Sequence, residues 1–210
     1  MRLIGMLDSP YVRRVALCLD VMGIPFQHES VSVFSTFEQF QQINPVVKAP
    51  TLVCDDGIVL MDSGLILQYA AALPGCRDPL LPSDVSSLQQ ALRAIGLALA
   101  AYEKSVQIVY ERNLRPAEKQ HAPWLARVSG QLVAAYITLE REVVRGVAPF
   151  DGGLNQASIT TAVGWQFTQS MLATVIDAAQ FPALAKLSAQ LEATPLFRRY
   201  PPDGPGVPSN

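Results

Sequence analysis

The order of short apolar and helical patterns in the first 73 residues restricts this part of the chain to a mixed α/β fold. The pattern predicts, in chain order, a strand over 2–6, a helix over 10–22, a strand over 26–33, a helix over 35–43, strands over 51–54 and 58–61, and a helix over 63–73. The "DDG" between the last two strands is a tight hairpin signal. The expected order is therefore βαβ followed by αββα.

The first helix has clear start and stop signals. Ser9 is a good N-cap, and Pro10 stands at the first helical position, where its missing N–H costs no hydrogen bond. Gly23 ends the helix, and Pro25 supports a stop there. We therefore expect the hydroxyl of Ser9 at the N-terminal mouth of this helix.

The pattern changes after residue 74. The stretch "PGCRDPLLPSD" is rich in proline and polar residues, which is typical of a linker. Helical periodicity then dominates, and the candidate helices span 85–114, 117–145, 157–174 and 182–193. We expect a first domain over 1–74, a linker over 75–84 and an all-α domain over 85–210. The tail "YPPDGPGVPSN" is expected to be extended or disordered.

The composition limits which partners the protein can bind and indicates its cellular compartment. A formal net charge of −2 argues against nucleic acid or an anionic membrane as partner. Cys18, Cys54 and Cys76 are widely spaced and form no zinc pattern, which favours reduced thiols in a cytoplasm. "MRLIGMLDSP" has no long apolar stretch, so we expect no signal peptide. "AIGLALAAY" falls short of the roughly 18 apolar residues of a membrane span.

The chain resembles the cytosolic glutathione transferases, whose first domain is thioredoxin-like. The N-terminal cues are "SPYVRRVAL", "INPVVKAPTLVCDDGIVLMDSGLILQYA" and "PLLPSD", and the C-terminal cues are "VYERNLRPAEK" and "FPALAKLSAQLEATPLFRRYPP". The resemblance covers nearly the whole chain and is greatest to bacterial members with a serine after the first strand. It implies a thioredoxin-like α/β domain (βαβ–αββα), an all-α C-terminal domain, and glutathione as co-substrate without a further cofactor or metal.

By this resemblance, Ser9 is the catalytic residue. The thiolate of glutathione is the reactive form, and a hydroxyl at a helix N-terminus supplies a donor and partial positive charge to stabilise it. The alternative is a plain N-cap, a role that serine fills in any protein. Arg13 or Arg14 would add positive potential, but we interpret both as residues of a solvated helix face.

Two further segments would bind the rest of glutathione. In "KAP", the resemblance implies that Pro50 is cis, that Ala49 offers its backbone to the cysteinyl part, and that Lys48 lies near the glycyl carboxylate. The alternative for Lys48 is an ordinary exposed loop lysine. In "MDSG", Ser63 would bind the γ-glutamyl carboxylate and Asp62 the ammonium group. Both residues also fit as simple capping residues of a helix start.

The second substrate, by resemblance a small apolar electrophile, would lie between the domains. Tyr102, Val106 and Tyr110 share one face of the helix over 85–114, and Tyr11 would line the same pocket. Aromatic residues at this spacing also fit a simple core. The stretch "LALAAYEKSVQ" lacks the Ala-Asp-Gly pattern expected nearby, so substrate preference stays open.

Other positions depart from the family pattern or are interpreted as ordinary structural residues. Val47 stands where the family often has glycine, and Asp62 where many members have glutamate. Ser158 is followed by Thr161 instead of aspartate, a weaker capping box. We interpret His28 and His121 as surface or loop residues and Cys54 as a core residue.

The resemblance predicts an enzyme that conjugates glutathione to electrophiles and forms a homodimer. Glutathione-dependent reduction of peroxides or disulfides is a related alternative. A dithiol route is disfavoured because Ser9 and Val12 stand at the two cysteine positions. A non-catalytic scaffold for a protein partner, or a carrier of apolar ligands, belongs to a different class. The presence of "KAP", "DS" and Ser9 favours a protein that binds glutathione.

Overall fold

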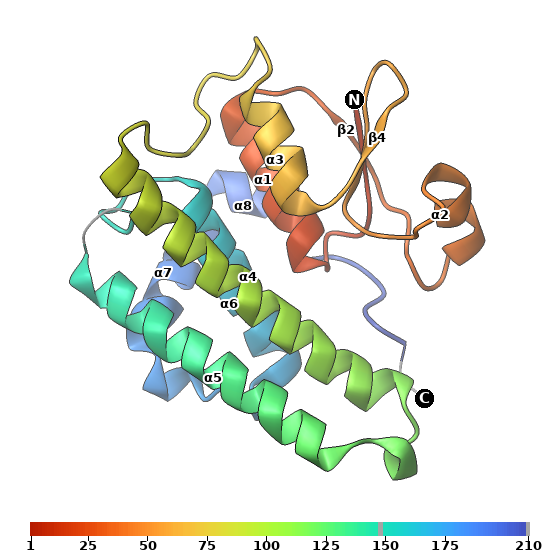
Figure 1. Ribbon diagram of the computed structural model, residues 1–210, viewed down its shortest axis with the longest axis vertical. Helices are drawn as coiled ribbons and strands as arrows, with labels where there is room; N and C mark the ends of the chain where they lie inside the picture. The colour runs from red at the N-terminus through yellow and green to blue at the C-terminus, as the bar shows by residue number, and fades with distance from the viewer. Residues whose placement is uncertain (147–148, 209–210) are drawn as a thin grey trace. The chain divides into compact units, whose positions relative to one another are not determined.

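The computed structural model describes residues 1–146 and 149–208 and divides the chain into two units (Figure 1). The first unit comprises Met1–Leu80 and Pro195–Gly206, and the second comprises Leu81–Thr194 and the chain from Val207. From the sequence we expect 195–206 in the helical domain, so this segment belongs to the other unit than predicted. Residues 147–148 and 209–210 of that predicted domain lie outside the described residues.

A small four-stranded sheet forms the centre of the first unit. Its strands are β1 (Arg2–Ile4), β2 (Gln27–Glu29), β3 (Thr51–Val53) and β4 (Val59–Leu60), in the order β2-β1-β3-β4. β1 is parallel to β2 and antiparallel to β3, and β3 and β4 form the predicted hairpin. Ile4 pairs with Thr51, so the end of β1 and the start of β3 lie at the same edge of the sheet.

Four helices accompany this sheet: α1 (Pro10–Met22), α2 (Phe37–Ile43), α3 (Ser63–Ala71) and α8 (Pro195–Arg199). α1 has the predicted caps, since Ser9 is its N-cap and Gly23 ends it in the left-handed conformation at φ 72°. The βαβ–αββα order predicted from the sequence is confirmed. The strands are shorter than predicted because only two or three residues of each predicted strand pair with a neighbouring strand.

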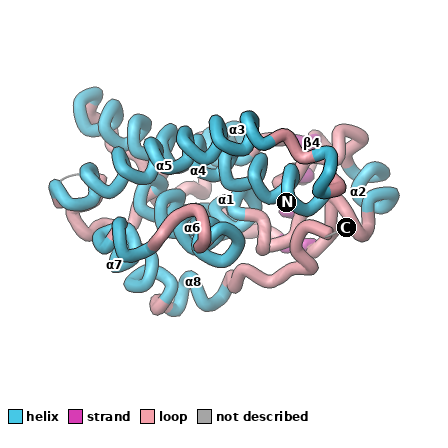
Figure 2. The backbone as a smooth tube through the Cα atoms, turned by 90° about the horizontal axis from the view of Figure 1, so that it is seen from below, coloured by secondary structure: helices cyan, strands magenta, loops and turns pink. Residues whose placement is uncertain are grey.

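Residues 200–208, after α8, have no regular secondary structure, as predicted, but part of this segment is hydrogen-bonded to the first unit (Figure 2). The Asp8 amide donates to the Asp203 carbonyl at 3.2 Å, and the Gly206 amide donates to the Asp8 carboxylate at 2.8 Å. The Arg13 guanidinium donates to the Tyr200 carbonyl at 2.7 Å. These contacts explain why 195–206 belongs to the first unit.

The second unit is built from four long helices: α4 (Val85–Leu114), α5 (Ala122–Arg145), α6 (Gln156–Leu172) and α7 (Pro182–Glu192). Two short 3₁₀ helices, η1 (Ala117–Lys119) and η2 (Ala178–Gln180), stand before α5 and α7. The helix predicted over 117–145 is therefore η1 followed by α5. Figure 1 shows α4 and α5 packed along one another. None of the described helices is long and apolar enough to cross a membrane.

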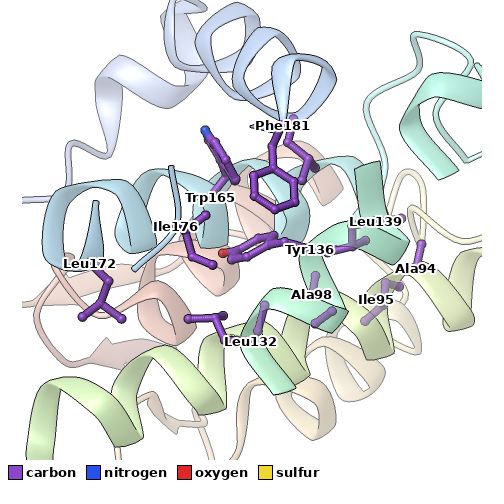
Figure 3. Packing of buried hydrophobic residues seen from close by; sticks show 14 of the residues in the cluster. Ala94, Ile95, Ala98, Leu132, Tyr136, Leu139, Trp165, Leu172, Ile176 and Phe181 are labelled. Carbon is purple, nitrogen blue, oxygen red and sulfur yellow. The ribbon is translucent and has the colours of Figure 1, made fainter. Parts of the chain in front are cut away.

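Three aromatic rings occupy the core of the second unit (Figure 3). Tyr136, Trp165 and Phe181 meet edge to face, with ring centroids 5.2 to 6.1 Å apart. The Tyr136 hydroxyl donates to the Gly164 carbonyl at 3.0 Å and also bonds the Thr168 hydroxyl. Burial raises the pKa of Tyr136, so its phenol stays protonated.

The start of α6 differs from the prediction. Its N-cap is Asn155, whose side chain accepts from the Ser158 amide, while the Ser158 hydroxyl accepts from the Asn155 amide, each at 3.0 Å. The capping box is therefore Asn155 with Ser158, and the prediction of Ser158 with Thr161 is wrong. Thr161 lies one turn further along, where its buried hydroxyl has no hydrogen-bond partner among the described residues.

Candidate active site

The loops that contain the predicted site residues leave the same edge of the sheet. β1 leads through Gly5 to Ser9, and β3 begins directly after Pro50, with Ile4 and Thr51 paired across the two strands. Gly5 has φ 140°, and a Cβ there would lie 2.6 Å from a Val12 methyl group and 3.2 Å from the Ala49 Cβ. Only glycine lets the first turn of α1 and the "KAP" loop approach so closely.

Ser9 is a helix cap whose hydroxyl donates no hydrogen bond to any described residue. Its backbone is extended at φ −73° and ψ 121°, and its oxygen accepts from the Val12 amide at 3.5 Å. This distance is the long limit of a hydrogen bond, so the cap is weak. The hydroxyl hydrogen is not used by that bond, and the side chain is partly exposed. The cap interpretation is confirmed, and the hydroxyl can still donate to a ligand.

The "KAP" loop has the predicted cis peptide bond between Ala49 and Pro50. The buried Asn44 amide donates to the Thr51 hydroxyl at 2.8 Å, and that hydroxyl donates to the Lys48 carbonyl at 2.7 Å. This chain of bonds fixes the loop from inside. The Lys48 side chain is exposed. The sequence analysis missed Asn44, because an Asn-Pro pair only indicates the start of a loop.

Val47 takes the backbone conformation that glycine would adopt most easily. Its φ is 51°, in the left-handed region. The family preference for glycine at this position therefore has a steric reason, and the loop keeps the left-handed turn despite the β-branched side chain.

The start of α3 brings Asp62 and Ser63 together in the predicted way. Asp62 is the N-cap and accepts from the Gly64 amide at 3.1 Å, and its carboxylate is exposed. Ser63 is the first helical residue and is buried. Its hydroxyl oxygen accepts from the Arg14 guanidinium at 2.9 Å, which ties α3 to α1.

The structure corrects the interpretation of Arg13 and Arg14 as solvated residues, because both side chains are only 1% exposed. Arg13 lies over the Phe197 ring with its guanidinium carbon 5.4 Å from the centroid, and Arg14 reaches Ser63. A helix pattern cannot show that other elements, α8 and α3, cover its polar face.

The residues predicted to contact the electrophile do not have a common environment. Tyr102 is fully buried in the second unit, and its hydroxyl donates to the Thr160 carbonyl at 2.6 Å. Its ring packs on Gly164, which has no room for a side chain. Tyr102 is therefore a core residue, and its predicted contact with substrate is wrong. Tyr110 is 38% exposed, and Val106 and Tyr11 are partly buried.

The two isolated histidines and Cys54 have different environments. His28 lies in β2, not in a loop, and its Nε2 donates to the Gly5 carbonyl at 2.8 Å. His121 is exposed at the N-cap of α5. Cys54 is buried, as predicted, and burial raises the pKa of its thiol. Across residues 1–146 and 149–208, no three His, Cys, Asp or Glu side chains are grouped to hold a metal ion.

Comparison with known proteins shows similarity to glutathione S-transferases, in the first unit by a family model and over nearly the whole chain by relatives. Residues 3–77 match the family model of the glutathione S-transferase N-terminal domain. The Escherichia coli protein described as the uncharacterised GST-like protein YibF is 28% identical over 204 residues, which cover 96% of this chain and 98% of that protein.

Two bacterial crystal structures have similar folds. A glutathione S-transferase from Methylobacterium radiotolerans, in complex with glutathione sulfonate, has a TM-score of 0.84 at 27% identity, covering 100% of this chain and 95% of that one. A glutathione transferase family member from Pseudomonas fluorescens, with bound glutathione, has a TM-score of 0.84 at 28% identity and covers 97% and 99%. Residues 3–77 therefore match the glutathione S-transferase N-terminal domain, and the whole chain is similar in sequence and fold to bacterial glutathione S-transferases.

Proposed function

We propose that the protein is a glutathione transferase that joins the thiolate of glutathione to small apolar electrophiles. The observation that carries this proposal is the shared sheet edge of β1 and β3, from which the Ser9 and cis-Pro50 loops both leave. The Methylobacterium and Pseudomonas structures, which contain glutathione sulfonate and glutathione, support it.

In this proposal Ser9 stabilises the reacting thiolate. Its hydroxyl donates a hydrogen bond to the sulfur, and the N-terminus of α1 adds partial positive charge. The thiol proton leaves to solvent, and the thiolate attacks an electrophilic carbon. A leaving group departs with the electron pair of the broken bond, or in an addition the carbanion takes a proton from water. The hydroxyl makes this step easier because the thiolate, not the thiol, is the nucleophile.

The remainder of the site would bind the three parts of the tripeptide. We assign the cysteinyl backbone to Ala49 in front of Pro50 and the glycyl carboxylate to Lys48. Ser63 would bind the γ-glutamyl carboxylate at the N-terminus of α3, and the exposed Asp62 carboxylate its ammonium group. The charges of Lys48 and Asp62 are opposite to those of the groups that they would meet.

For the electrophile we propose contacts with Tyr11, which follows Ser9 at the start of α1, and with Val106 and Tyr110 on α4. These side chains are only partly buried and offer apolar surface. A cytoplasmic homodimer with a role in detoxification, as the resemblance to the family implies, completes the proposal.

Turnover of a chloronitrobenzene with glutathione tests the assignment of Ser9. The Ser9→Ala variant should lose activity by about tenfold or more and should need a higher pH to reach half of its maximal rate, because the thiolate loses a donor. Ser30→Ala removes an exposed serine of the same unit and should leave both quantities unchanged. An unchanged rate and pH profile in Ser9→Ala would contradict the catalytic role. Glutathione binding without turnover of any electrophile would favour a binding scaffold.

A further inference from the structure

Residues 200–206, which we call the C-terminal strap, follow α8 and are fastened to the first unit at both ends. At one end the Tyr200 carbonyl accepts from the buried Arg13 guanidinium at 2.7 Å. At the other end the Gly206 amide donates to the Asp8 carboxylate at 2.8 Å. A chain end without helix or strand stays ordered only where such contacts hold it, so α1 and the loop before α1 determine the path of the strap.

The strap is bonded to both the main chain and the side chain of Asp8. The Asp8 amide donates to the Asp203 carbonyl at 3.2 Å, and the carboxylate accepts from Gly206, which lies 198 residues further along the chain. The backbone of Gly204 lies so near this carboxylate that an added Cβ would overlap it. A rotation of the Asp8 backbone would therefore break contacts with the strap.

The Asp8 carboxylate also faces the backbone of Ser9. Burial raises the pKa of this carboxyl, and the groups that act to lower it are backbone amides, those of Gly206, Ser9 and Asp8 itself. The Ser9 amide also donates to the Met6 carbonyl at 3.2 Å, which closes the turn before α1. The carboxylate is thus the group that joins the strap to the backbone of Ser9.

We propose that Asp8 is a positioning residue that acts through Ser9, and that the C-terminal strap holds the Ser9 hydroxyl where it donates to the sulfur of glutathione. This inference rests on the proposed function. The cap bond from the Val12 amide to the Ser9 hydroxyl is 3.5 Å long and constrains the hydroxyl only weakly, so the strap supplies the missing constraint. A displacement of about 1 Å at a catalytic group can slow a reaction on the order of 100-fold.

Gly204→Ala tests the strap without removing any charge. The added Cβ occupies the space of the Asp8 carboxylate and forces the two apart. We expect kcat for conjugation to fall by about tenfold and half of the maximal rate to require a higher pH, because the thiolate loses its donor. The KM for glutathione should change by less than about twofold. Gly75→Ala is the control, since its Cβ would make only an ordinary contact at 3.9 Å, and it should alter none of these quantities.

Two substitutions of Asp8 separate its hydrogen bond from its charge. Asp8→Ala removes the acceptor for Gly206 and should lower kcat as much as Gly204→Ala does. Asp8→Asn removes the same charge but keeps an oxygen that can accept, so most of kcat should return. Asp8→Ala combined with Gly204→Ala should cost little more than Asp8→Ala alone, because the added Cβ no longer meets a carboxylate.

Titration with S-methylglutathione distinguishes positioning of Ser9 from a general loss of structure. This peptide keeps all the tripeptide groups but has no ionisable thiol, so wild type, Gly204→Ala and Asp8→Ala should bind it with equal affinity. If its affinity falls together with kcat, or if kcat and the pH profile of Gly204→Ala and Asp8→Ala equal those of wild type, the inference is wrong while the proposed function stands. If wild type neither binds nor conjugates glutathione, the proposed function fails and the inference fails with it.

Discussion

Gly206 donates its backbone N–H to the carboxylate of Asp8 at 2.8 Å, which ties the end of the chain to the residue immediately before Ser9. The Asp8 amide also donates to the Asp203 carbonyl, and Gly204 approaches the carboxylate so closely that no side chain would fit there. The Asp8 carboxylate is therefore enclosed by the C-terminal segment 203–206, and its ionisation is linked to how firmly that segment is held.

Asp8→Asn should make stability less dependent on pH. Burial raises the pKa of Asp8 above 3.8 in the folded protein. A raised carboxyl pKa contributes stability below the unfolded value, and this contribution is lost as the pH rises through the folded value. The asparagine oxygen can still accept from Gly206 without a charge. Urea unfolding between pH 4 and 7 should show that the variant gains stability relative to wild type as the pH rises. A constant difference would contradict this effect.

Asn44→Ala should loosen the "KAP" loop. The buried amide of Asn44 donates to Thr51, which in turn holds the Lys48 carbonyl, so its removal leaves buried polar atoms without partners. We expect a loss of about 1–3 kcal/mol in the free energy of unfolding and weaker glutathione binding. Gln42→Ala, an exposed change on α2, is the control and should alter neither. Denaturant unfolding and titration of the same samples would show whether the two losses occur together.

Gly164→Ala should destabilise the second unit. An added Cβ would collide with the Tyr102 ring, which is held by its hydroxyl bond to the Thr160 carbonyl. The expected loss is about 1–3 kcal/mol in the free energy of unfolding. Gly96→Ala on α4 meets no atom within 4 Å and should be neutral or stabilise by up to about 1 kcal/mol. Equal changes in the thermal unfolding temperature of the two variants would show that contact with the Tyr102 ring does not cause the loss of stability.

Thr161→Val should stabilise the protein. The Thr161 hydroxyl is buried and unpaired within the described chain, and valine has nearly the same shape without the polar atom. We expect a gain of about 1 kcal/mol in the free energy of unfolding. Thr160→Val removes a hydroxyl that donates to the Gln156 carbonyl at 2.6 Å and should bring no gain. A loss of stability in Thr161→Val would mean that its hydroxyl has a partner, such as a bound water.

Local signals in the sequence were enough to place most of the helices in both units. Asp84 and the long apolar periodicity define α4 with the predicted bounds, and Ser9 and Gly23 do the same for α1. α8 was missed because five residues that begin with Pro195 show no helical period. The break at 120–121 before α5 was missed although Pro123, in the first turn of α5, is a signal for a helix start.

Site residues could be predicted from the sequence only where their role depends on neighbouring residues in the chain. Ser9 and Asp62 are capping residues, and Ser63 follows Asp62 as the first residue of α3, so their places at the helix starts follow from the sequence. Arg14 and Asn44 donate hydrogen bonds to residues distant in the chain, and no local pattern shows these contacts. Tyr102 was misassigned because helical spacing alone does not distinguish a buried face from a substrate-binding face.

The central claim is that glutathione binds at the Ser63 end of this site, and calorimetric titration of wild type and Ser63→Ala tests it most directly. We expect one glutathione per chain in wild type and affinity weakened by about tenfold or more in Ser63→Ala, because a hydrogen bond to a carboxylate is lost. No binding to wild type at millimolar glutathione, or equal affinity in the two proteins, would contradict it.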